Sequence, residues 1–439
     1  MHSFLRFVSS LFFILNTLII KAAVVTPEQF GAKGDGIEDD TYSIIKAFET
    51  RQTVELQNTY RVSKSLIINS SISGGGRILF AEEQISLHIK GKGISISSIS
   101  FDYANHSGKM IRIQDATNVR FNHCMFENVG NENSTSDVAF VLIMNNSNNI
   151  RFEECDFLHC KAKPSNYAAS GIWINQESEE TKSHHIYVDN CRFEDFSPLS
   201  DADAIKVVGG NYDCFLYVKR CIFRTCEKRA MKFQGKKCYS QNNTIYVTKP
   251  MSYAIDFQRG HGKSENDKVI LEYDGTSPID KSMGLLYRAI GIAQGNVVVK
   301  NFSVKCIKGF SNLHQVAIEF ESLGGYDAGN VSNVKLTNCT IDGMGSILSC
   351  TSNVICINKV KVKSLRFDSK TPCDAILFKQ AQVSNSLFDI DISGQALYNL
   401  IYSTNNDQIS DNDIRIKTES NKTLKLPKSN KIRLTNKNN

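Results

Sequence analysis

The sequence predicts an all-β protein built as a parallel β-solenoid, and two internal repeats carry this prediction. In each copy of the first repeat, apolar residues alternate with polar ones, pause for two residues and then alternate again. Six copies begin at Asn118, Asn149, His185, Phe215, Asn296 and Asn333. Because an alternation of period two is typical of strands, each copy predicts two short strands joined by a bend.

The second repeat is a single short strand of the form small-apolar-x-apolar, and it follows most copies of the first. Its copies begin at Ala139, Gly171, Ala204, Ala230, Ala254, Ala289, Ala317 and Ala375. Polar turns and no helical segments separate the strands, so neighbouring repeats are expected to pair strand to strand along a stack. A β-sandwich is the alternative fold, but it would not repeat the same strands in the same order so often. The wide spacing before Ala375 leaves room for one coil without a visible copy.

The cysteines follow the first repeat rather than the loops. Five of the thirteen share one register, in which Phe302 also stands: Cys124, Cys155, Cys191, Cys221 and Cys339. A shared register places these side chains in one column inside the stack. We therefore expect buried free thiols, which pack as small apolar groups, rather than disulfides.

Composition indicates a globular chain of balanced charge. The 439 residues are 41% hydrophobic, and the net charge is +6. Residues 417–439 hold seven Lys and Arg residues and one acidic residue, so residues 1–416 balance at 44 charges of each sign. A neutral body argues against nucleic acid as a partner, because that task usually needs a basic face. We expect residues 417–439 to form a flexible basic tail.

The first 23 residues have the character of an export signal. Arg6 precedes a mostly apolar run that is short for a membrane span and typical of a secretory signal peptide. An uncleaved anchor is the alternative, because Lys21 lies close to the expected cleavage point. We expect an exported protein, whether secreted, periplasmic or on the cell surface, with no stable membrane partner beyond this segment. Residues 24–416 then form the folded domain.

Residues 29–49 predict a cap for the open end of the solenoid. A glycine turn leads to Asp39 and Asp40 as helix-cap candidates and then to an amphipathic helix from Thr41 to Phe48. The stretch FGAKGDGIEDDT resembles the opening motif of the pectate-lyase-like superfamily of right-handed parallel β-helices. That superfamily includes polysaccharide lyases, polygalacturonase-type glycoside hydrolases, epimerases and phage tailspikes. The resemblance implies a single right-handed parallel β-helix with a short N-terminal capping helix, and one such fold hosts many reactions.

The outward face of the second repeat holds the candidate functional residues. Its x position is occupied, coil by coil, by Val141, Trp173, Lys206, Lys232, Asp256, Gly291, Glu319 and Leu377. Positions beside this column add Asn175, Gln234 and Gln258, and also Asp203, Arg229, Tyr253 and Arg288. An aromatic ring that suits a sugar face, together with polar groups for hydroxyls and carboxylates, predicts a saccharide-binding groove. The alternative is an ordinary solvent-exposed strand face with paired charges.

One chemistry that fits this face is β-elimination on a uronate-containing polymer. Two stacked lysines repel each other's charge, so Lys206 or Lys232 is expected to be neutral enough to act as the base. Arg229, Arg259 and Arg288 would then bind the substrate carboxylate and acidify the neighbouring C–H bond.

The other chemistry is hydrolysis between two carboxyl groups. Asp256 and Glu319 stand two visible coils apart, about 9 to 10 Å, near the upper end of the separation that suits inversion. Asp203 is a further candidate acid. Polygalacturonase-type enzymes contain a Gly-His-Gly, which this chain matches around His261, but their other motifs are absent here. His261 is better explained as a turn residue than as a catalyst, and it is retained as a substrate-binding candidate.

No cofactor is required by these residues, although calcium fits one short segment. Asp201 and Asp203 lie two residues apart and are candidate calcium ligands, yet a turn uses aspartate equally well.

The sequence thus favours an exported enzyme that cleaves an acidic polysaccharide by β-elimination. A polygalacturonase-like hydrolase is the first alternative. A non-catalytic β-helix that binds a surface polysaccharide or assists its synthesis is the second. The expected partner is a polysaccharide, and the oligomeric state stays open.

Overall fold

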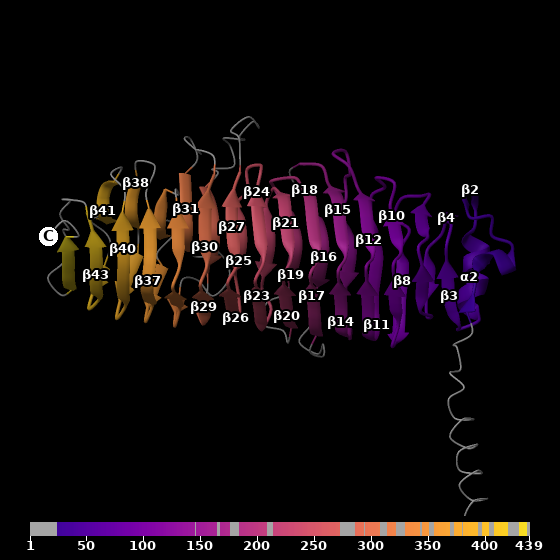
Figure 1. Ribbon diagram of the computed structural model, residues 1–439, viewed down its shortest axis with the longest axis horizontal. Helices are drawn as coiled ribbons and strands as arrows, with labels where there is room; N and C mark the ends of the chain where they lie inside the picture. The colour runs from indigo at the N-terminus through magenta and orange to yellow at the C-terminus, as the bar shows by residue number, and fades with distance from the viewer. Residues whose placement is uncertain are drawn as a thin grey trace, which may run out of the picture.

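The computed structural model describes residues 24–436 apart from the following positions: 145, 165–166, 176–183, 209–213, 273–285, 294, 308–313, 322–329, 343–344, 351–354, 369–372, 380, 394–396, 404–407 and 420–429. The chain forms an elongated right-handed parallel β-helix in which successive coils lie side by side along one axis (Figure 1). This architecture confirms the predicted solenoid. The predicted signal peptide lies outside the described residues.

Each central coil contains three strands, and equivalent strands of successive coils pair in parallel. The first series carries the second sequence repeat, and its members are β5 (Leu66–Ile68), β8 (Leu87–Lys92), the start of β11 (Lys109–Asn122), β13 (Val138–Ile143), β16 (Ala169–Asn175), β19 (Ala202–Val208), β22 (Arg229–Phe233), β25 (Tyr253–Phe257), β28 (Leu286–Ile292), β31 (His314–Phe320), β35 (Ser346–Cys350), β38 (Cys373–Phe378) and β41 (Leu397–Ser403).

The second and third series carry the two halves of the first sequence repeat. The second series comprises β1 (Val24–Val25), β3 (Thr53–Leu56), β6 (Ile72–Gly74), β9 (Ser95–Ser97), the end of β11, β14 (Asn148–Glu153), β17 (His184–Asp189), β20 (Cys214–Lys219), β23 (Lys237–Gln241), β26 (His261–Glu265), β29 (Val297–Lys300), β33 (Lys335–Thr337), β37 (Lys361–Asp368), β40 (Leu387–Ser393), β43 (Asp413–Thr418) and β44 (Lys431–Asn436). The third series comprises β2 (Asp35–Asp39), β4 (Thr59–Val62), β7 (Arg77–Phe80), β10 (Ser100–Asp102), β12 (Met125–Val129), β15 (Asp156–Lys161), β18 (Arg192–Ser197), β21 (Ile222–Cys226), β24 (Thr244–Val247), β27 (Lys268–Leu271), β30 (Ser303–Cys306) and β34 (Thr340–Asp342).

The N-terminal cap consists of a 3-10 turn (Pro27–Phe30) and the helix α2 (Thr41–Glu49), which ends one residue later than predicted. Asp39 accepts a hydrogen bond from the Thr41 backbone N–H at 3.1 Å, as a capping residue does. Asp40 does not cap the helix with its side chain, because its carboxylate binds the backbone N–H groups of Lys33 and Gly34 instead. Asp39 and Asp40 of the opening motif thus have different tasks, one at the helix and one at the glycine turn.

The register of the first series differs from the sequence alignment at one coil. Leu142, not Val141, pairs with Trp173, and Val141 pairs with the core residue Ile172. The copy that was not visible in the sequence is β35, whose Ser349 pairs with Glu319. Its pattern was hidden because Ile347 stands where the other copies have alanine or glycine, and serine occupies its outward position.

The solenoid extends past the predicted boundary at residue 416. Strand β44 lies within the segment expected to be a flexible tail, and it pairs in parallel with β43. Asn430 explains this extra strand, because its buried side chain accepts hydrogen bonds from the backbone N–H and side-chain amide of Asn412 at 3.2 and 2.9 Å. The C-terminal coils also contain a small separate sheet of β32 (Asn330–Ser332), β36 (Ile355–Asn358), β39 (Ala381–Ser384) and β42 (Gln408–Ser410).

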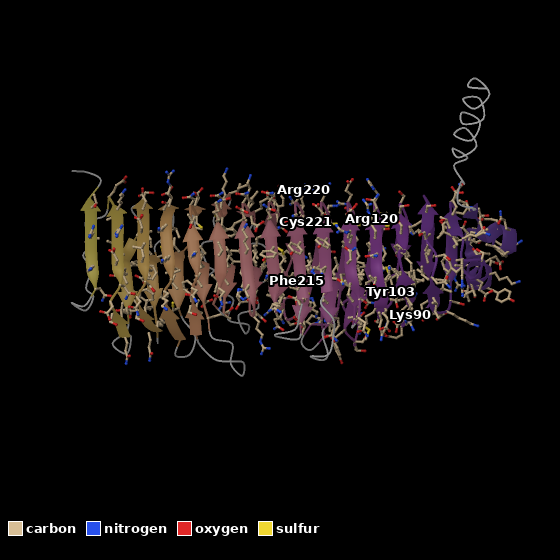
Figure 2. All side chains as sticks on the ribbon, turned by 90° about the horizontal axis from the view of Figure 1, so that it is seen from below. Lys90, Tyr103, Arg120, Phe215, Arg220 and Cys221 are labelled. Atoms are coloured by element: carbon tan, nitrogen blue, oxygen red, sulfur yellow. The ribbon has the colours of Figure 1, made fainter. Side chains whose placement is uncertain are left out.

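The interior is an apolar core with the predicted column of cysteines at one bend. Twelve of the thirteen cysteines are free thiols in the structure, and only Cys306 among these twelve is not buried. In Figure 2, Cys221 lies at the same bend as the outer residue Arg220, and Arg120 lies further along that edge. The prediction of buried free thiols is confirmed for these residues. No helix in the part of the chain that the structure describes is long and apolar enough to cross a membrane.

Polar residues continue the cysteine column into the next coils. Asn243 accepts a hydrogen bond from the Cys221 backbone N–H at 2.8 Å, and its own N–H donates to Asp267 at 2.8 Å. Asp267 is buried and also accepts from the Ser264 hydroxyl at 2.6 Å. Burial raises the pKa of Asp267 to about 6, despite these hydrogen bonds. An ionised carboxylate at this point of the core therefore opposes folding.

We expect Asp267→Asn to stabilise the protein at neutral pH. An asparagine can repeat what Asn243 does one coil earlier, where the side-chain amide donates to the Ser240 hydroxyl at 2.9 Å. The folded pKa lies above the usual 3.8, so stability contributed by the neutral acid is lost as pH rises from about 4 to about 6. Thermal unfolding should show a gain on the order of 2 to 3 kcal/mol above that window and little gain at pH 4. The exposed Asp368→Asn serves as the control and should show no such pH-dependent gain.

Candidate functional site

The outward face of the first series carries a continuous polar strip. Trp173 pairs with Lys206, Lys206 with Lys232, and Lys232 with Asp256, each on the neighbouring strand. The strip then passes Gly291 and reaches Glu319. This is the predicted order, with the two lysines side by side. The strip is not an ordinary solvated face, because Lys206 is only 4% exposed, and Asp256 and Glu319 are fully buried.

The buried Arg229, on the same strand as Lys232, contacts three acidic residues in the middle of the strip. The Nε atom of Arg229 donates to Asp203 at 2.5 Å, and its Nη2 atom donates to Asp201 at 3.0 Å. Its Nη1 atom lies 3.6 Å from Oδ2 of Asp256. Burial alone would raise the pKa of Asp203, but Arg229 and the two lysines hold it below its usual range. Asp203 is therefore an ionised partner of the arginine.

Asp256 is held by a chain of side-chain amides. Gln234 donates to Gln258 at 2.6 Å, and Gln258 donates to Oδ2 of Asp256 at 2.7 Å. The other oxygen, Oδ1, is buried and has no hydrogen-bond partner among the described residues. Buried polar atoms are nearly always paired, so this oxygen is an unsatisfied group in the strip. Asp256 has no exposed surface, so a bound molecule reaches this oxygen only when neighbouring side chains move.

Asp256 also has the carboxyl group best suited to hold a proton near neutral pH. Burial raises its pKa to about 7, and the nearby charge of Glu321 acts in the same direction. Arg229 and Lys232 oppose the shift without cancelling it. Burial likewise raises the pKa of Glu321. The two carboxyl groups therefore behave as a coupled pair.

Gly291 makes room for the side chains of Glu321 and Tyr253. It occupies the position in the strip where neighbouring coils carry Asp256 and Glu319, and a Cβ atom there would lie 2.7 Å from the Tyr253 ring and 2.9 Å from Glu321. The Tyr253 hydroxyl donates to Glu321 at 2.7 Å across the gap. Glu321 thus reaches over Gly291 to Tyr253, which lies on the same strand as Asp256. We call this place in the strip the Gly291 notch.

Glu319 has a different environment from Glu321. It is fully buried and forms an ion pair with Arg288. Arg288 in turn lies over the Tyr253 ring, with its guanidinium carbon 4.7 Å from the ring centre. Both the predicted carboxylate Glu319 and the predicted clamp Arg288 are therefore engaged with each other.

Trp173 lies at the other end of the strip and contacts two lysines. The Nζ atom of Lys206 stands 4.1 Å from the centre of the Trp173 ring, and that of Lys109 stands 5.9 Å away. The ring is only half-buried, but its Nε1 atom is buried without a hydrogen-bond partner in the described part of the chain. Burial lowers the pKa of Lys206. The charge of Lys232 lowers this pKa further, and the charge of Asp203 opposes the shift.

Three other predicted residues lie at varying distance from the strip. Asn175 belongs to β16, where it pairs with Val208 at the end of the strand. Arg259 follows Gln258 at the turn that leaves the first series. His261 lies beyond that turn on β26 of the second series, where it pairs with Lys237. The structure therefore does not bring His261 to the strip.

The predicted calcium ligands are occupied by protein atoms. Asp201 and Asp203 both bind Arg229, and no group of three or more His, Cys, Asp or Glu residues suited to a metal occurs within the described residues. Calcium binding stays a prediction.

Two functional positions were not singled out from the sequence. Glu321 stands on the same face as Gln234 and Gln258, two residues after the strip position, and this spacing was the available signal. Gly291 was visible only as a missing side chain in a polar column. Its importance depends on the side chains that fill the gap, which the sequence pattern does not describe.

Comparison with known proteins supports the fold but does not identify a reaction. No protein-family profile matches the sequence, and no curated protein matches it either. A mutant tailspike protein of E. coli bacteriophage HK620, in complex with a pentasaccharide, matches in structure at 12% identity with a TM-score of 0.56, over 93% of this chain and 78% of that one. Another mutant of that protein, in complex with a hexasaccharide, matches at 13% identity with a TM-score of 0.55, over 89% of this chain and 75% of that one.

A second phage protein has the same architecture. Tailspike protein 3 of bacteriophage CBA120 matches at 10% identity with a TM-score of 0.53, over 89% of this chain and 61% of that one. The chain is thus a right-handed parallel β-helix of the kind found in phage tailspikes, as its opening motif implied. At these identities the likeness concerns the fold.

Proposed function

We propose that this protein hydrolyses glycosidic bonds in a polysaccharide, with Asp256 as the general acid and Glu321 as its partner carboxylate. The observation that carries the proposal is the coupled pair of carboxyl groups with raised pKa values at the Gly291 notch. Hydrolysis of a glycosidic bond uses two such groups, one that gives a proton to the leaving oxygen and one that remains ionised.

The coupling itself supplies the required protonation state. Two close carboxyl groups cannot both ionise easily, so the pair of Asp256 and Glu321 holds one proton near neutral pH. Gln258 donates to Asp256, and Tyr253 donates to Glu321, which fixes the orientation of both groups. One carboxyl can then protonate the glycosidic oxygen while the other acts on the sugar carbon or on a water molecule.

Hydrolysis is preferred to elimination because two of the three expected arginine clamps, Arg229 and Arg288, are already neutralised. Arg229 binds Asp203 and Asp201, and Arg288 binds Glu319. A uronate carboxylate could bind either arginine only by displacing a carboxylate that is already there. Leaving a buried charge without its partner costs several kcal/mol. The amides of Gln234 and Gln258 and the ring of Trp173 instead suit hydroxyl groups and a sugar face.

The nature of the substrate is supported in two ways. Trp173 and the Gly291 notch lie along one strip, so a chain of sugar units can lie parallel to the solenoid axis. The structural neighbours include tailspikes in complex with a pentasaccharide and a hexasaccharide. Export through residues 1–23 is part of the proposal, because a large polysaccharide lies outside the cell that makes it.

Elimination remains the second candidate because of Lys206. Burial lowers the pKa of this lysine, which is the shift that a lysine base needs. The two reactions differ in their products, since elimination leaves an unsaturated sugar that absorbs ultraviolet light, and hydrolysis leaves only a new reducing end.

A panel of acidic and neutral polysaccharides tests the proposal directly. Reducing ends should appear with at least one polymer, without a rise in ultraviolet absorbance. An equal rise in absorbance would support Lys206 and elimination. Saturable binding of a polymer with no new reducing ends would instead support the non-catalytic alternative.

The pH dependence of hydrolysis should report the coupled pair. Since Asp256 has a pKa raised to about 7, kcat/KM should fall about tenfold per pH unit above that value as the general acid loses its proton. It should also fall in acid, once both carboxyl groups are protonated. Initial rates between pH 4 and pH 9 check this. A rate that keeps rising above pH 8 would indicate a lysine base.

A further inference from the structure

A basic trough runs along the second series in the C-terminal half, on a different face from the strip. It is a depression of about 550 Å³, lined by His261, Asn296, Val298, Asn333, Lys335, Lys359, Lys361 and Asn385. These residues belong to two outward columns that are two residues apart on successive coils. No acidic side chain lines it.

Three lysines give the trough its charge. Lys335, Lys359 and Lys361 are exposed, and none forms an ion pair within the described residues. Lys335 and Lys361 pair on neighbouring strands, so their backbones lie about 4.8 Å apart. Like charges on adjacent strands destabilise a sheet, so this arrangement is unfavourable for folding alone. A bound anion would relieve the repulsion.

The acidic residues that flank the trough do not neutralise these lysines. At its C-terminal end, Asp413 follows Lys361 and Leu387 in the same column and binds Arg415 at 2.5 Å. Glu265, at the N-terminal end, binds Lys263 at 2.6 Å and Lys300 at 3.3 Å. Glu265 and Asp413 are therefore already paired and leave the charges of the three lysines uncompensated.

The backbone also places a lysine where its neighbours have asparagine. Asn296, Asn333, Lys359 and Asn385 occupy equivalent bends with φ of 61°, 57°, 56° and 50°. Asparagine tolerates this left-handed conformation better than lysine does. Lys359 thus adds a positive charge to the trough at a position where asparagine would be the easier residue.

We propose that this trough binds an acidic polysaccharide chain that lies along the solenoid axis. The lysines recur coil by coil, as the charged groups of an acidic polymer recur along its backbone. The amides of Asn296 and Asn333 supply donors and acceptors for hydroxyl groups between those charges. The inference stands apart from the proposed hydrolysis, because a chain that cleaves nothing can still bind a polymer here.

An acidic polysaccharide fits the trough better than a nucleic acid does. Residues 1–416 carry equal numbers of positive and negative charges, a balance that is unusual for a chain whose partner is a nucleic acid. Among the described residues, the trough also has no arginine, phenylalanine, tyrosine or tryptophan side chain to hold phosphates or stack on bases.

Binding of fluorescently labelled polygalacturonate by the full chain tests the inference. The triple variant Lys335→Ala/Lys359→Ala/Lys361→Ala should bind at least about tenfold more weakly than the wild type, since each exposed charge contributes a fraction of that loss. It should keep its unfolding temperature and its cleavage of short oligosaccharides, because these side chains lie in the solvent, away from the strip.

The matched control removes three exposed lysines from the N-terminal half. Lys64→Ala/Lys90→Ala/Lys92→Ala changes the net charge equally and should leave the affinity within about twofold of the wild type. An equal loss in both triple variants would show that only net charge matters, and would overturn the inference. It would also be overturned if the wild type binds no acidic polymer, or if duplex DNA competes as well as unlabelled polygalacturonate.

Discussion

Asp256→Asn is expected to abolish cleavage while leaving the β-helix folded. The substitution keeps the shape of the side chain and its hydrogen bond from Gln258 after a flip of the amide, but it removes the transferable proton. Loss of a general acid costs roughly 10² to 10⁴ in rate. Initial rates of reducing-end formation, measured together with circular dichroism and the unfolding temperature, give both outcomes for one sample.

Two neighbours provide the contrast. Glu321→Gln should lose activity to a similar extent, because it removes the partner carboxylate. Lys232→Ala changes the residue that pairs with Asp256 on the next strand and should stay within about tenfold of the wild type. A full loss in Lys232→Ala combined with normal rates in Asp256→Asn would move the chemistry to the lysines.

Arg229→Met is expected to give the largest loss of stability of any single change in the strip. The guanidinium is the buried partner of Asp203, which is fully buried itself. Breaking a buried ion pair by removing one partner costs about 3 to 5 kcal/mol, because it leaves a charge without compensation. Urea unfolding monitored by circular dichroism measures the free energy of unfolding.

Arg220→Met is the matched control for this change. Arg220 is 63% exposed and binds Asp189 at 2.6 Å, whereas the side chain of Arg229 is 8% exposed. A pair between exposed groups contributes about 1 kcal/mol or less. If the two variants lose the same free energy, the buried cluster does not hold the strip together. Adding Asp203→Asn to Arg229→Met should recover part of the loss, since it removes the stranded charge.

The fold was predictable because the sequence repeats itself. Alternation fixed the strands, the spacing fixed their order along the stack, and the shared register of Cys124 and Cys155 placed them inside the solenoid. The coil around Ser349 was not predicted because Ile347 replaces the small first residue of the repeat, and an outward serine does not stand out from a turn. The end of the domain was also misplaced, since Asn430 shows its role only when it is seen beside Asn412.

The strip was predictable as a column but not as a set of contacts. Period two shows that Lys206, Lys232 and Asp256 share a face, and the structure pairs them in that order. It does not show that Arg229 turns towards acidic residues instead of solvent, or that Glu321 reaches back over Gly291. Side-chain length and neighbouring coils decide these contacts.

The preferred reaction changed from elimination to hydrolysis because of these side-chain contacts. From the sequence, exposed arginines favoured elimination, because free positive charges would bind a uronate. In the structure Arg229 and Arg288 bind carboxylates, and the raised pKa falls on Asp256. A carboxyl that holds its proton near neutral pH is the group that hydrolysis requires.

Cleavage in water labelled with heavy oxygen tests hydrolysis at this strip most directly. With a polymer that the wild type cleaves, mass spectrometry of the products should show one heavy oxygen at each new reducing end, and Asp256→Asn should yield no such product. Products that form without heavy oxygen and carry an unsaturated sugar would contradict the account.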